Sequence, residues 1–331
     1  MKKVFVTGAT GYIGSHTVAS LLDHGYDVTG IDNFSNSNPS VVDVIRKISK
    51  KKFNFYEIDL LNKHDLGGLF INHKYDVIIH FAGLKSVNES LLFPEKYFSE
   101  NLEMLNNLLV LKDQSTDFIF SSTASVYDPS HKPPFKEDDP TKPSTPYGIC
   151  KLLSEKILES VSSLRNFKTI CLRYFNPLGA HPSGLMGEMP TVFPNNLMPY
   201  LLDVAASERP FLSIFGNDYS TPDGTGCRDF IHVLDLAKGH VSAIDYLSKI
   251  KHNFEVINLG TGSYTSVIQL VNSFEQVNNI KIPYKIAPRR EGDSAISYAN
   301  ITKALQLLNW KPKYGLKEMC QDAWHWKKNQ K

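Results

Sequence analysis

Short apolar runs separated by longer amphipathic stretches dominate the first half of the chain. Each run covers only a few residues, too short for a helix but typical of a strand that is buried on both faces. The stretches between the runs have the length of a helix and mix polar with apolar positions. This pattern predicts an α/β fold in which a doubly wound parallel sheet is joined by right-handed crossovers. The predicted strands cover residues 4–6, 27–31, 53–58, 76–81 and 118–121, and the first helix covers residues 15–24.

The regular alternation stops near residue 180. Proline and glycine become frequent in the segment that starts with His181-Pro182-Ser183-Gly184. We therefore predict a first domain over residues 1–180 and a smaller C-terminal α/β lobe over residues 181–331. Residues 254–260 contain another apolar run typical of a buried strand. The pattern leaves open whether the chain returns there to the first domain.

Composition narrows the class of protein. The chain has 331 residues, of which 42% are hydrophobic and 21% charged, with a net charge of +2. These values are typical of a globular protein and predict no nucleic-acid or membrane partner. The N-terminal apolar run ends at Thr7-Gly8, far short of a secretory or membrane-spanning segment. The four cysteines have no CxxC spacing and the histidines no ligand spacing, so we predict a cytoplasmic, reduced protein without a metal site.

Glycines follow the first predicted strand in a GxxGxxG pattern, Gly8, Gly11 and Gly14. Between a strand and a helix, small residues allow a tight turn and a close approach of the backbone to a pyrophosphate, which the helix N-terminus then binds. Asp32 ends the second predicted strand, where a carboxylate bonds the ribose hydroxyls of NAD and repels the extra phosphate of NADP. Asp59, after the third strand, is a candidate for the adenine amine. The pattern predicts a Rossmann-type domain that binds NAD.

Tyr147 and Lys151 lie four residues apart, on one face of a predicted helix that Pro146 begins. A tyrosine is a poor base at its ordinary pKa of about 10, and a neighbouring ammonium together with an oxidised nicotinamide favours the phenolate and lowers that pKa. By itself this spacing is more often an ordinary surface pair. However, Thr123 belongs to a run of hydroxyls just past the fifth strand, at the edge where ligands of open α/β sheets bind. Together these positions predict a short-chain dehydrogenase type of active site.

Several longer strings extend the comparison over almost the whole chain. On them the sequence resembles the UDP-glucose 4-epimerases, which interconvert UDP-glucose and UDP-galactose and belong to the extended short-chain dehydrogenase/reductase family. The strings that carry the resemblance are Gly11–Thr17, His80–Lys85, Leu172–Pro177, Pro194–Tyr200, Ile214–Tyr219, Asp223–Gly226 and Arg228–Val233.

The resemblance implies a role for each matching position. Tyr147 corresponds to the catalytic base, Lys151 to its partner and anchor of the nicotinamide ribose, and Thr123 to the hydroxyl that bonds the reacting sugar oxygen, where serine is more common. The implied NAD contacts are Gly8, Gly11, Tyr12, Ile13, Gly14, Asp32, Asn33, Asp59, Phe81, Lys85, Asn101, Tyr147, Lys151 and Tyr174. The implied UDP-sugar contacts are Lys85, Thr123, Tyr147, Phe175, Asn176, Asn195, Asn196, Leu197, Ser213, Phe215, Arg228, Arg290, Asp293 and Ser297.

The resemblance also implies a mechanism and an assembly. The sugar would be oxidised transiently at C4 by bound NAD with Tyr147 as acid and base, in a homodimer formed through helices near residues 91–111 and 151–161. Ser297 resembles the position of a sugar-pocket gate, where a large tyrosine excludes N-acetyl sugars. Since serine leaves room, we predict additional activity on UDP-GlcNAc and UDP-GalNAc.

Two alternatives differ in their chemistry. A related nucleotide-sugar enzyme, such as a 4,6-dehydratase or a decarboxylase, is less favoured, because a dehydratase needs an acid pair beside the threonine and the sequence has Ala124-Ser125 there. An NAD-binding sensor without catalysis typically lacks the tyrosine or the lysine. Both are present, which favours an active enzyme.

Overall fold

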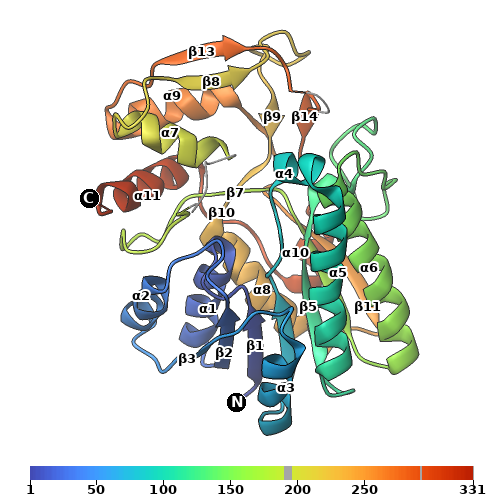
Figure 1. The fold of residues 1–331 in the computed structure, drawn as a ribbon. Helices are drawn as coiled ribbons and strands as arrows, with labels where there is room; N and C mark the ends of the chain where they lie inside the picture. Colours follow the sequence, from blue (N-terminus) through green and yellow to red (C-terminus); the bar gives the residue numbers. More distant parts are fainter. Residues whose placement is uncertain (190–195, 291–292, 331) are drawn as a thin grey trace.

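A parallel sheet forms the centre of the molecule (Figure 1). The computed structural model describes residues 1–189, 196–290 and 293–330. Within them the sheet has seven strands in the order β11-β6-β5-β4-β1-β2-β3, and every neighbouring pair is parallel. The predicted fold class, a doubly wound Rossmann-type sheet, is confirmed. The strands are β1 (Lys3–Thr7), β2 (Asp27–Asp32), β3 (Asn54–Glu57), β4 (Val77–His80), β5 (Asp117–Thr123), β6 (Thr169–Tyr174) and β11 (Phe254–Leu259).

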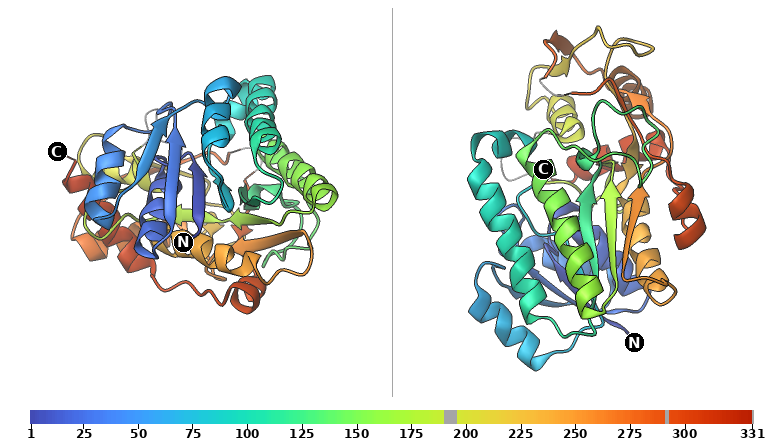
Figure 2. Two further views of the ribbon diagram at one scale, coloured as in Figure 1. Left: turned by 90° about the horizontal axis from the view of Figure 1, so that it is seen from below. Right: turned by 90° about the vertical axis from the view of Figure 1, so that its right-hand side faces the viewer.

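Helices cover both faces of this sheet (Figure 2). Neighbouring residues of β1 point to opposite faces, so Val4 and Val6 join one apolar cluster and Phe5 joins the other. This explains why the strands are apolar without alternation. The first cluster includes side chains of α1 (Tyr12–Asp23), α2 (Ser40–Ser49), α8 (Val233–Leu247) and α10 (Thr302–Leu308). The second includes those of α3 (Lys63–Asn72), α5 (Pro94–Leu111) and α6 (Pro146–Arg165), with the short α4 (Val87–Leu92) leading into α5.

A smaller part lies beyond the carboxyl edge of the sheet and has its own apolar cluster (Figure 1). Leu201, Phe274 and Trp326 are among the buried residues of that cluster. The part is made of short strands and helices: α7 (Leu197–Ala205), β8 (Leu212–Phe215), β9 (Cys227–Arg228), β12 (Thr265–Ser266), α9 (Val267–Asn278), β13 (Tyr284–Ala287), β14 (Ile296–Ser297) and α11 (Leu316–Lys328). A two-stranded pair, β7 (Asn176–Leu178) with β10 (Phe230–His232), links it to the sheet.

The chain crosses between the two parts more than once. After the first short strands of the smaller part, α8 packs back onto α1, and β11 then pairs with β6 along its whole length. The sheet therefore contains residues from both sides of position 180. The predicted boundary there, as a division into domains, stays a prediction.

Three properties of the described residues bear on the class of protein. No helix in these ranges is long and apolar enough to cross a membrane. No group of three or more His, Cys, Asp or Glu side chains there is placed to hold a metal ion. All four cysteines are buried and unpaired.

Candidate active site

The turn between β1 and α1 is packed so tightly that only glycine fits. Gly8 has φ +66°, and a Cβ there would lie 2.7 Å from the backbone nitrogen of Ala82. A Cβ on Gly14 would lie 2.0 Å from the carbonyl oxygen of Gly8. Helix α1 begins after Gly11, and neither a side-chain cap nor an acid occupies its first turn. The N–H groups of residues 12–14 are thus placed to receive an anion such as a pyrophosphate.

The ends of β2 and β3 present carboxylates beside this turn. Asp32 accepts hydrogen bonds from the N–H of Thr10 at 3.1 Å and the N–H of Phe34 at 3.0 Å, which fixes its carboxylate next to the glycines. Asn33 donates its amide to Asp59 at 2.9 Å. Polar side chains that the sequence separates by more than twenty residues therefore meet at one edge, where a ribose and an adenine would lie in a Rossmann-type domain.

The loop after β4 is held by a side chain from α5. Asn101 accepts the N–H of Leu84 at 2.8 Å and donates to the carbonyl of Leu84 at 3.3 Å. A Cβ on Gly83 would lie 2.8 Å from the same amide oxygen. Asn101 thus fixes the loop that carries Lys85, whose ammonium lies 3.7 Å from Glu188. Both of its amide atoms are used on the loop, which makes Asn101 a support for that loop.

The three predicted catalytic side chains meet at the carboxyl end of β5. Thr123 is the last residue of β5, and its hydroxyl, which donates to Ser125 at 3.2 Å, lies close enough to the Tyr147 phenol to lower the pKa of that phenol. Lys151, one turn later on α6, donates its ammonium to the carbonyl of Ser121 at 2.7 Å. The Lys151 ammonium lies 6.0 Å from the centre of the Tyr147 ring. Pro146 stands in the first turn of α6 and Thr145 caps it, so the predicted helix places Tyr147 and Lys151 on one face as expected.

Burial shifts the pKa values of this group in a direction that the sequence did not predict for Tyr147. Burial raises the pKa of Tyr147 to about 12, and the hydrogen bond from Thr123 opposes this only in part. Burial also lowers the pKa of Lys151 to about 8. In the protein alone the phenol is desolvated, which raises the pKa of Tyr147, and the lowering expected from Lys151 together with an oxidised nicotinamide stays a prediction.

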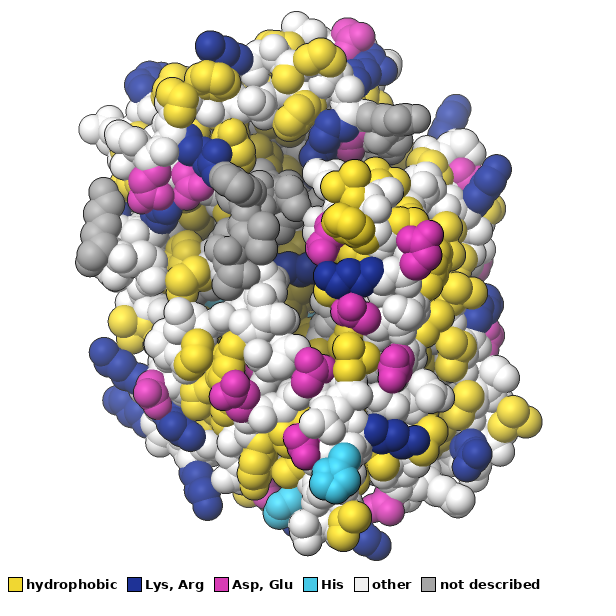
Figure 3. Space-filling view, in the orientation of Figure 1, with side chains coloured by type: hydrophobic (Ala, Val, Ile, Leu, Met, Phe, Trp, Pro, Cys, Tyr) yellow, Lys and Arg dark blue, Asp and Glu magenta, His cyan; other side chains and the backbone are white. Residues whose placement is uncertain are grey.

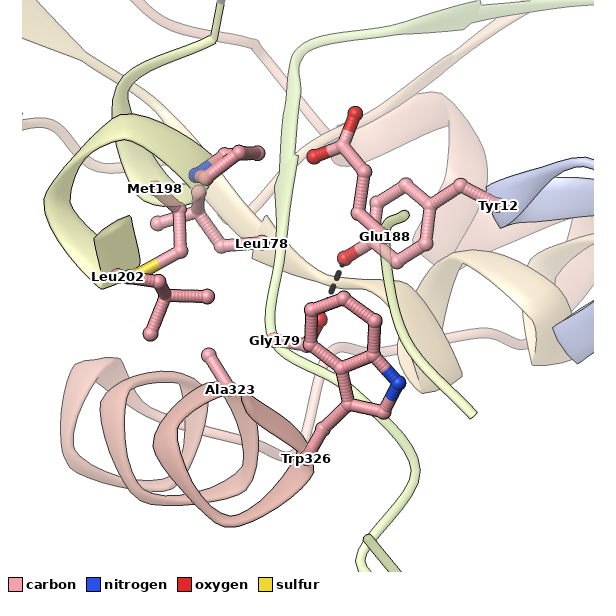
Figure 4. Close-up of a pocket in the computed structure, with 9 residues that line it drawn as sticks. Tyr12, Leu178, Gly179, Glu188, Met198, Leu202, Ala323 and Trp326 are labelled. Atoms are coloured by element: carbon pink, nitrogen blue, oxygen red, sulfur yellow. Dashed lines mark hydrogen bonds between the residues drawn. The ribbon is translucent and has the colours of Figure 1, made fainter. Parts of the chain in front are cut away.

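Two predicted NAD contacts direct their hydroxyls elsewhere. Tyr12, on α1, donates to the carbonyl of Gly179 at 2.7 Å, and both residues line a small cavity that α7 and α11 of the smaller part, with Trp326, also line (Figure 4). Tyr174 lies 2.5 Å from Nε2 of His240. His240 also packs on Phe81, with ring centres 4.8 Å apart. The rings of Tyr174 and Phe81 are therefore parts of the wall behind the catalytic group, and Tyr12 ties the two parts of the molecule together.

Across from the sheet edge, an acid joins two arginines. Asp293 accepts from Nη2 of Arg228 at 3.1 Å and from Nε of Arg290 at 2.8 Å. Arg290 is half exposed, and its guanidinium lies 5.1 Å from the ring of Phe215. Forked guanidinium groups of this kind suit a diphosphate. The space-filling view shows the surface hollowed between the smaller part and the sheet part (Figure 3).

The remaining predicted sugar-nucleotide contacts differ in exposure. Phe215 is 41% exposed, whereas Phe175 is 5% exposed and belongs to a buried cluster with Val126 and Phe135. The ring of Phe175 therefore packs inside the protein, and its contact with a UDP-sugar stays a prediction. Ser213 lies on β8 and Leu197 begins α7, while Ser297 lies on β14, paired with Arg228 of β9. Asn176 is exposed, Asn196 donates to Glu188 at 2.9 Å, and Asn195 lies outside the described residues.

A family comparison decides the class of this site. The model of the NAD dependent epimerase/dehydratase family matches residues 4–260. The chain belongs to this family. A UDP-glucose 4-epimerase of Dictyostelium discoideum is 47% identical over 327 residues, covering 98% of this chain and 95% of its own length. The UDP-glucose 4-epimerase of Bacillus subtilis is 44% identical over 329 residues, covering 98% of this chain and 96% of its own.

Solved structures agree with this membership of the epimerase/dehydratase family. A UDP-glucose 4-epimerase of Stenotrophomonas maltophila, solved with NAD and formylated UDP-arabinopyranose, superposes with a TM-score of 0.96 at 40% identity, covering 100% of this chain and 99% of its own. The enzyme of Bifidobacterium longum, solved with NAD⁺ and UDP, gives a TM-score of 0.94 at 41% identity and covers 99% and 98%.

Two residues near the site of this family member were missed by the sequence analysis. Asp229 is fully buried and accepts from the N–H and hydroxyl of Thr261 at 2.8 and 2.6 Å, and from the N–H groups of Gly262 and Ala299 at 3.2 and 3.1 Å. It joins the segments that follow β11 and β14 to β9, which carries Arg228. An acid in an otherwise apolar string, Asp229-Phe230-Ile231, was the available signal. No signal in the sequence pointed to Glu188, which contacts Lys85 and Asn196.

Proposed function

We propose that this chain interconverts UDP-glucose and UDP-galactose by transient oxidation of the sugar at C4, with bound NAD and with Tyr147 as the acid and base. The observation that carries the proposal is the meeting of Thr123, Tyr147 and Lys151 at the carboxyl edge of a sheet whose first turn admits only glycine. The family and the near full-length relatives support the same reaction.

The residues present fit NAD. The glycines leave backbone N–H groups at the start of α1 for the pyrophosphate, with Gly14 too close to Gly8 for any side chain to intervene. The Asp32 carboxylate, held by the N–H groups of Thr10 and Phe34, is placed for ribose hydroxyls and disfavours a 2′-phosphate. NAD, when bound, supplies the reversible two-electron oxidation of the sugar carbon.

The protein's own part in the reaction is to move one proton and to position the sugar. Tyr147 takes the proton of the sugar 4-hydroxyl and later returns it, while the hydroxyl of Thr123 holds the phenol and the sugar oxygen in line. Because burial raises the pKa of Tyr147 to about 12, the phenolate needs a positive charge close by. The Lys151 ammonium, held by the Ser121 carbonyl 6.0 Å from the centre of the Tyr147 ring, supplies part of this charge, and the oxidised nicotinamide, when bound, would supply the rest.

Epimerisation requires the sugar to present both faces of C4 while its nucleotide stays bound. In our proposal Arg228 and Arg290 hold the diphosphate through forked contacts, and Asp293 moves from the arginines to the uridine ribose. Phe215, 41% exposed, offers a ring for the uracil. The sugar ring turns while these contacts hold the nucleotide.

The test is proton NMR of the purified protein with UDP-galactose and no added NAD. We expect UDP-glucose to appear, which requires a bound cofactor that is regenerated in each cycle. Absence of conversion with and without added NAD would contradict the proposal. Tight NAD binding without conversion would instead favour a sensor.

We further propose activity on UDP-GlcNAc and UDP-GalNAc. Ser297 lies next to Arg228 across the β14–β9 pair, so its small side chain leaves volume beside the diphosphate site. Ser297→Tyr should remove conversion of the N-acetyl sugars and retain that of UDP-galactose. Equal loss of both activities would mean that position 297 is no gate.

We also propose a cytoplasmic homodimer. Exposed apolar side chains lie on the adjacent helices α5 and α6 and the residues before α5, among them Phe93 at 55%, Val110 at 57% and Leu153 at 42%. Such a patch suits a second copy of the chain. Leu153→Glu should yield monomers in light scattering after gel filtration, whereas Ile71→Glu, at a site 86% exposed on α3, should not. A mass of one chain for the unmodified protein would refute the dimer.

A further inference from the structure

A buried ion pair lies directly behind the Thr123, Tyr147 and Lys151 group. Arg173, on β6, donates Nε and Nη2 to the two carboxylate oxygens of Glu155 at 3.0 and 2.7 Å. The two side chains are 5% and 3% exposed. A buried pair of this kind adds little net stability compared with apolar residues of the same volume. Stability alone therefore does not explain why this ion pair lies in the core.

The pair is joined to the strand that carries Thr123. Arg173 and Ser122 face each other across the β5–β6 register. The hydroxyl of Ser122 donates to the same carboxylate oxygen of Glu155 that receives Nε of Arg173. Ser122 is the residue immediately before Thr123, so the carboxylate fixes the end of β5 from behind.

The pair is also joined to the helix that carries the other two catalytic side chains. Glu155 lies on α6, four residues after Lys151 and eight after Tyr147, which places all three on one side of the helix. Lys151 itself bonds the carbonyl of Ser121 at 2.7 Å. Two adjacent residues of β5, Ser121 and Ser122, are thus bound by two consecutive turns of α6.

The arginine is held on its other side as well. Its Nη1 donates to the carbonyl of Glu137 at 3.1 Å, and its guanidinium lies 4.8 Å from the centre of the Tyr127 ring. The Tyr127 hydroxyl donates to Asn258 of β11 at 2.6 Å. The Glu155 carboxylate accepts three hydrogen bonds, and Arg173 is also held by Glu137 and Tyr127, so the pair has one low-energy arrangement. Apolar side chains at these two positions would allow α6 to shift relative to β5.

We propose that Glu155 and Arg173 are positioning residues that set the separation between Thr123 on β5 and Tyr147 and Lys151 on α6. The proposal rests on the function proposed above. Their role is to keep the phenol, the threonine hydroxyl and the sugar oxygen within hydrogen-bonding reach, since a misplacement of about 1 Å can cost about a hundredfold in rate.

The experiment compares the double variant Glu155→Leu/Arg173→Met with the unmodified holoenzyme. Each single variant leaves one charge buried without its partner and should lower Tm by about 5–10 °C. The double variant removes both charges together, and its Tm should return to within about 3 °C of the unmodified protein. We expect its kcat for UDP-galactose to remain about 30- to 100-fold lower at a KM changed less than about threefold.

The matched control is Asp43→Asn/Arg46→Gln, which removes an exposed pair on α2, outside the proposed dimer surface, and should leave kcat within about twofold. A double variant with native Tm and native kcat would overturn the proposal, because the pair would then be a replaceable part of the core. If the double variant does not fold, the kcat and Tm of Ser122→Ala test the positioning role instead. This substitution removes one donor to Glu155, and a kcat lowered about fivefold or more without loss of Tm supports the positioning role, while unchanged kcat overturns it.

Failure of the proposed function gives a different result. In that case the unmodified holoenzyme itself converts no UDP-galactose. The positioning role is then measured without substrate, from crystal structures of the unmodified protein and the double variant. A longer distance between the Thr123 hydroxyl and the Tyr147 phenol oxygen in the variant would support the role, and an unchanged distance would overturn it.

Discussion

The sheet edge and the smaller part present their polar groups to a ligand in different ways. At the sheet edge Asp32 and Asn101 bind backbone groups of their own surroundings, so their positions are fixed before any cofactor arrives. In the smaller part the charges bind one another, with Asp293 between Arg228 and Arg290. In the proposed function, a cofactor would therefore meet a preorganised site, whereas a sugar nucleotide would exchange existing ion pairs for its own contacts.

This difference suits the proposed reaction. A cofactor that is regenerated in each cycle is best held by a rigid turn such as that of Gly8 and Gly14. A sugar that must rotate between two half-reactions needs contacts to its nucleotide that form and break quickly. The two kinds of site can be tested separately by substitutions that act on one and spare the other.

The largest effect is expected at the carboxyl edge of the sheet. Tyr147→Phe removes the only proposed acid and base, so kcat for UDP-galactose should fall by about a thousandfold, while the affinity for UDP should stay within about twofold. NMR conversion and calorimetric titration of UDP measure the two quantities. Tyr264→Phe, at an exposed tyrosine, is the control. A variant with more than about a tenth of the rate would show that Tyr147 is not the base.

The second largest effect is expected for a substitution of Asp229, which connects the sheet edge to the smaller part. Asp229→Asn turns one acceptor oxygen of a fully buried carboxylate into a donor among four donors. We expect stability to fall by about 2–4 kcal/mol and UDP to bind about tenfold more weakly. Retention of NAD should be affected less, since the glycine turn is not attached to Asp229. Chemical denaturation and UDP titration measure this, and weaker NAD binding with unchanged UDP binding would contradict it.

A smaller effect concerns the buried ammonium at the carboxyl edge of the sheet. Burial lowers the pKa of Lys151 to about 8, against an ordinary value of about 10.4. Between these values the unfolded chain binds more protons than the folded one, so this group makes the protein more stable as pH rises through that window. Compared with Lys151→Met, the unmodified protein should gain about 1.5 kcal/mol between pH 8 and pH 9.5. Denaturation curves of both proteins at the two pH values test this. A constant difference would mean that Lys151 keeps its ordinary pKa.

The smallest effect is expected for the ion pairs that Asp293 forms with Arg228 and Arg290 in the smaller part. Asp293→Asn frees Arg228 and Arg290 from their common acid, so inorganic pyrophosphate, which has no ribose, should bind about three- to tenfold more tightly. Asp218→Asn, which removes the acid partner of Arg289, is the control and should change the affinity less. Isothermal titration provides the affinities. Weaker pyrophosphate binding to the Asp293 variant would mean that the acid holds the arginines in a productive arrangement instead of competing with the ligand.

The sequence by itself determined the sheet and the chemistry at its edge. Apolar runs such as Val4–Val6 specify strands buried on both faces, and the close approach of Gly14 to Gly8 is possible only for the residue that stands there. Tyr147 and Lys151 fall on one helix face through their spacing alone. These are local signals, because backbone conformation and a few neighbours in the chain decide them.

Only the tertiary structure decided which groups are held in place and how they are charged. The sequence gives no sign that Phe175 is buried, that Asn101 is used on the loop of Leu84, or that Asp293 is shared by two arginines. Nor does it indicate that desolvation raises the pKa of Tyr147 or that Lys151 donates its ammonium to the carbonyl of Ser121. The reason is physical: burial and pairing depend on side chains brought together from distant parts of the chain, and their energies follow distance and solvent exposure rather than spacing along the sequence.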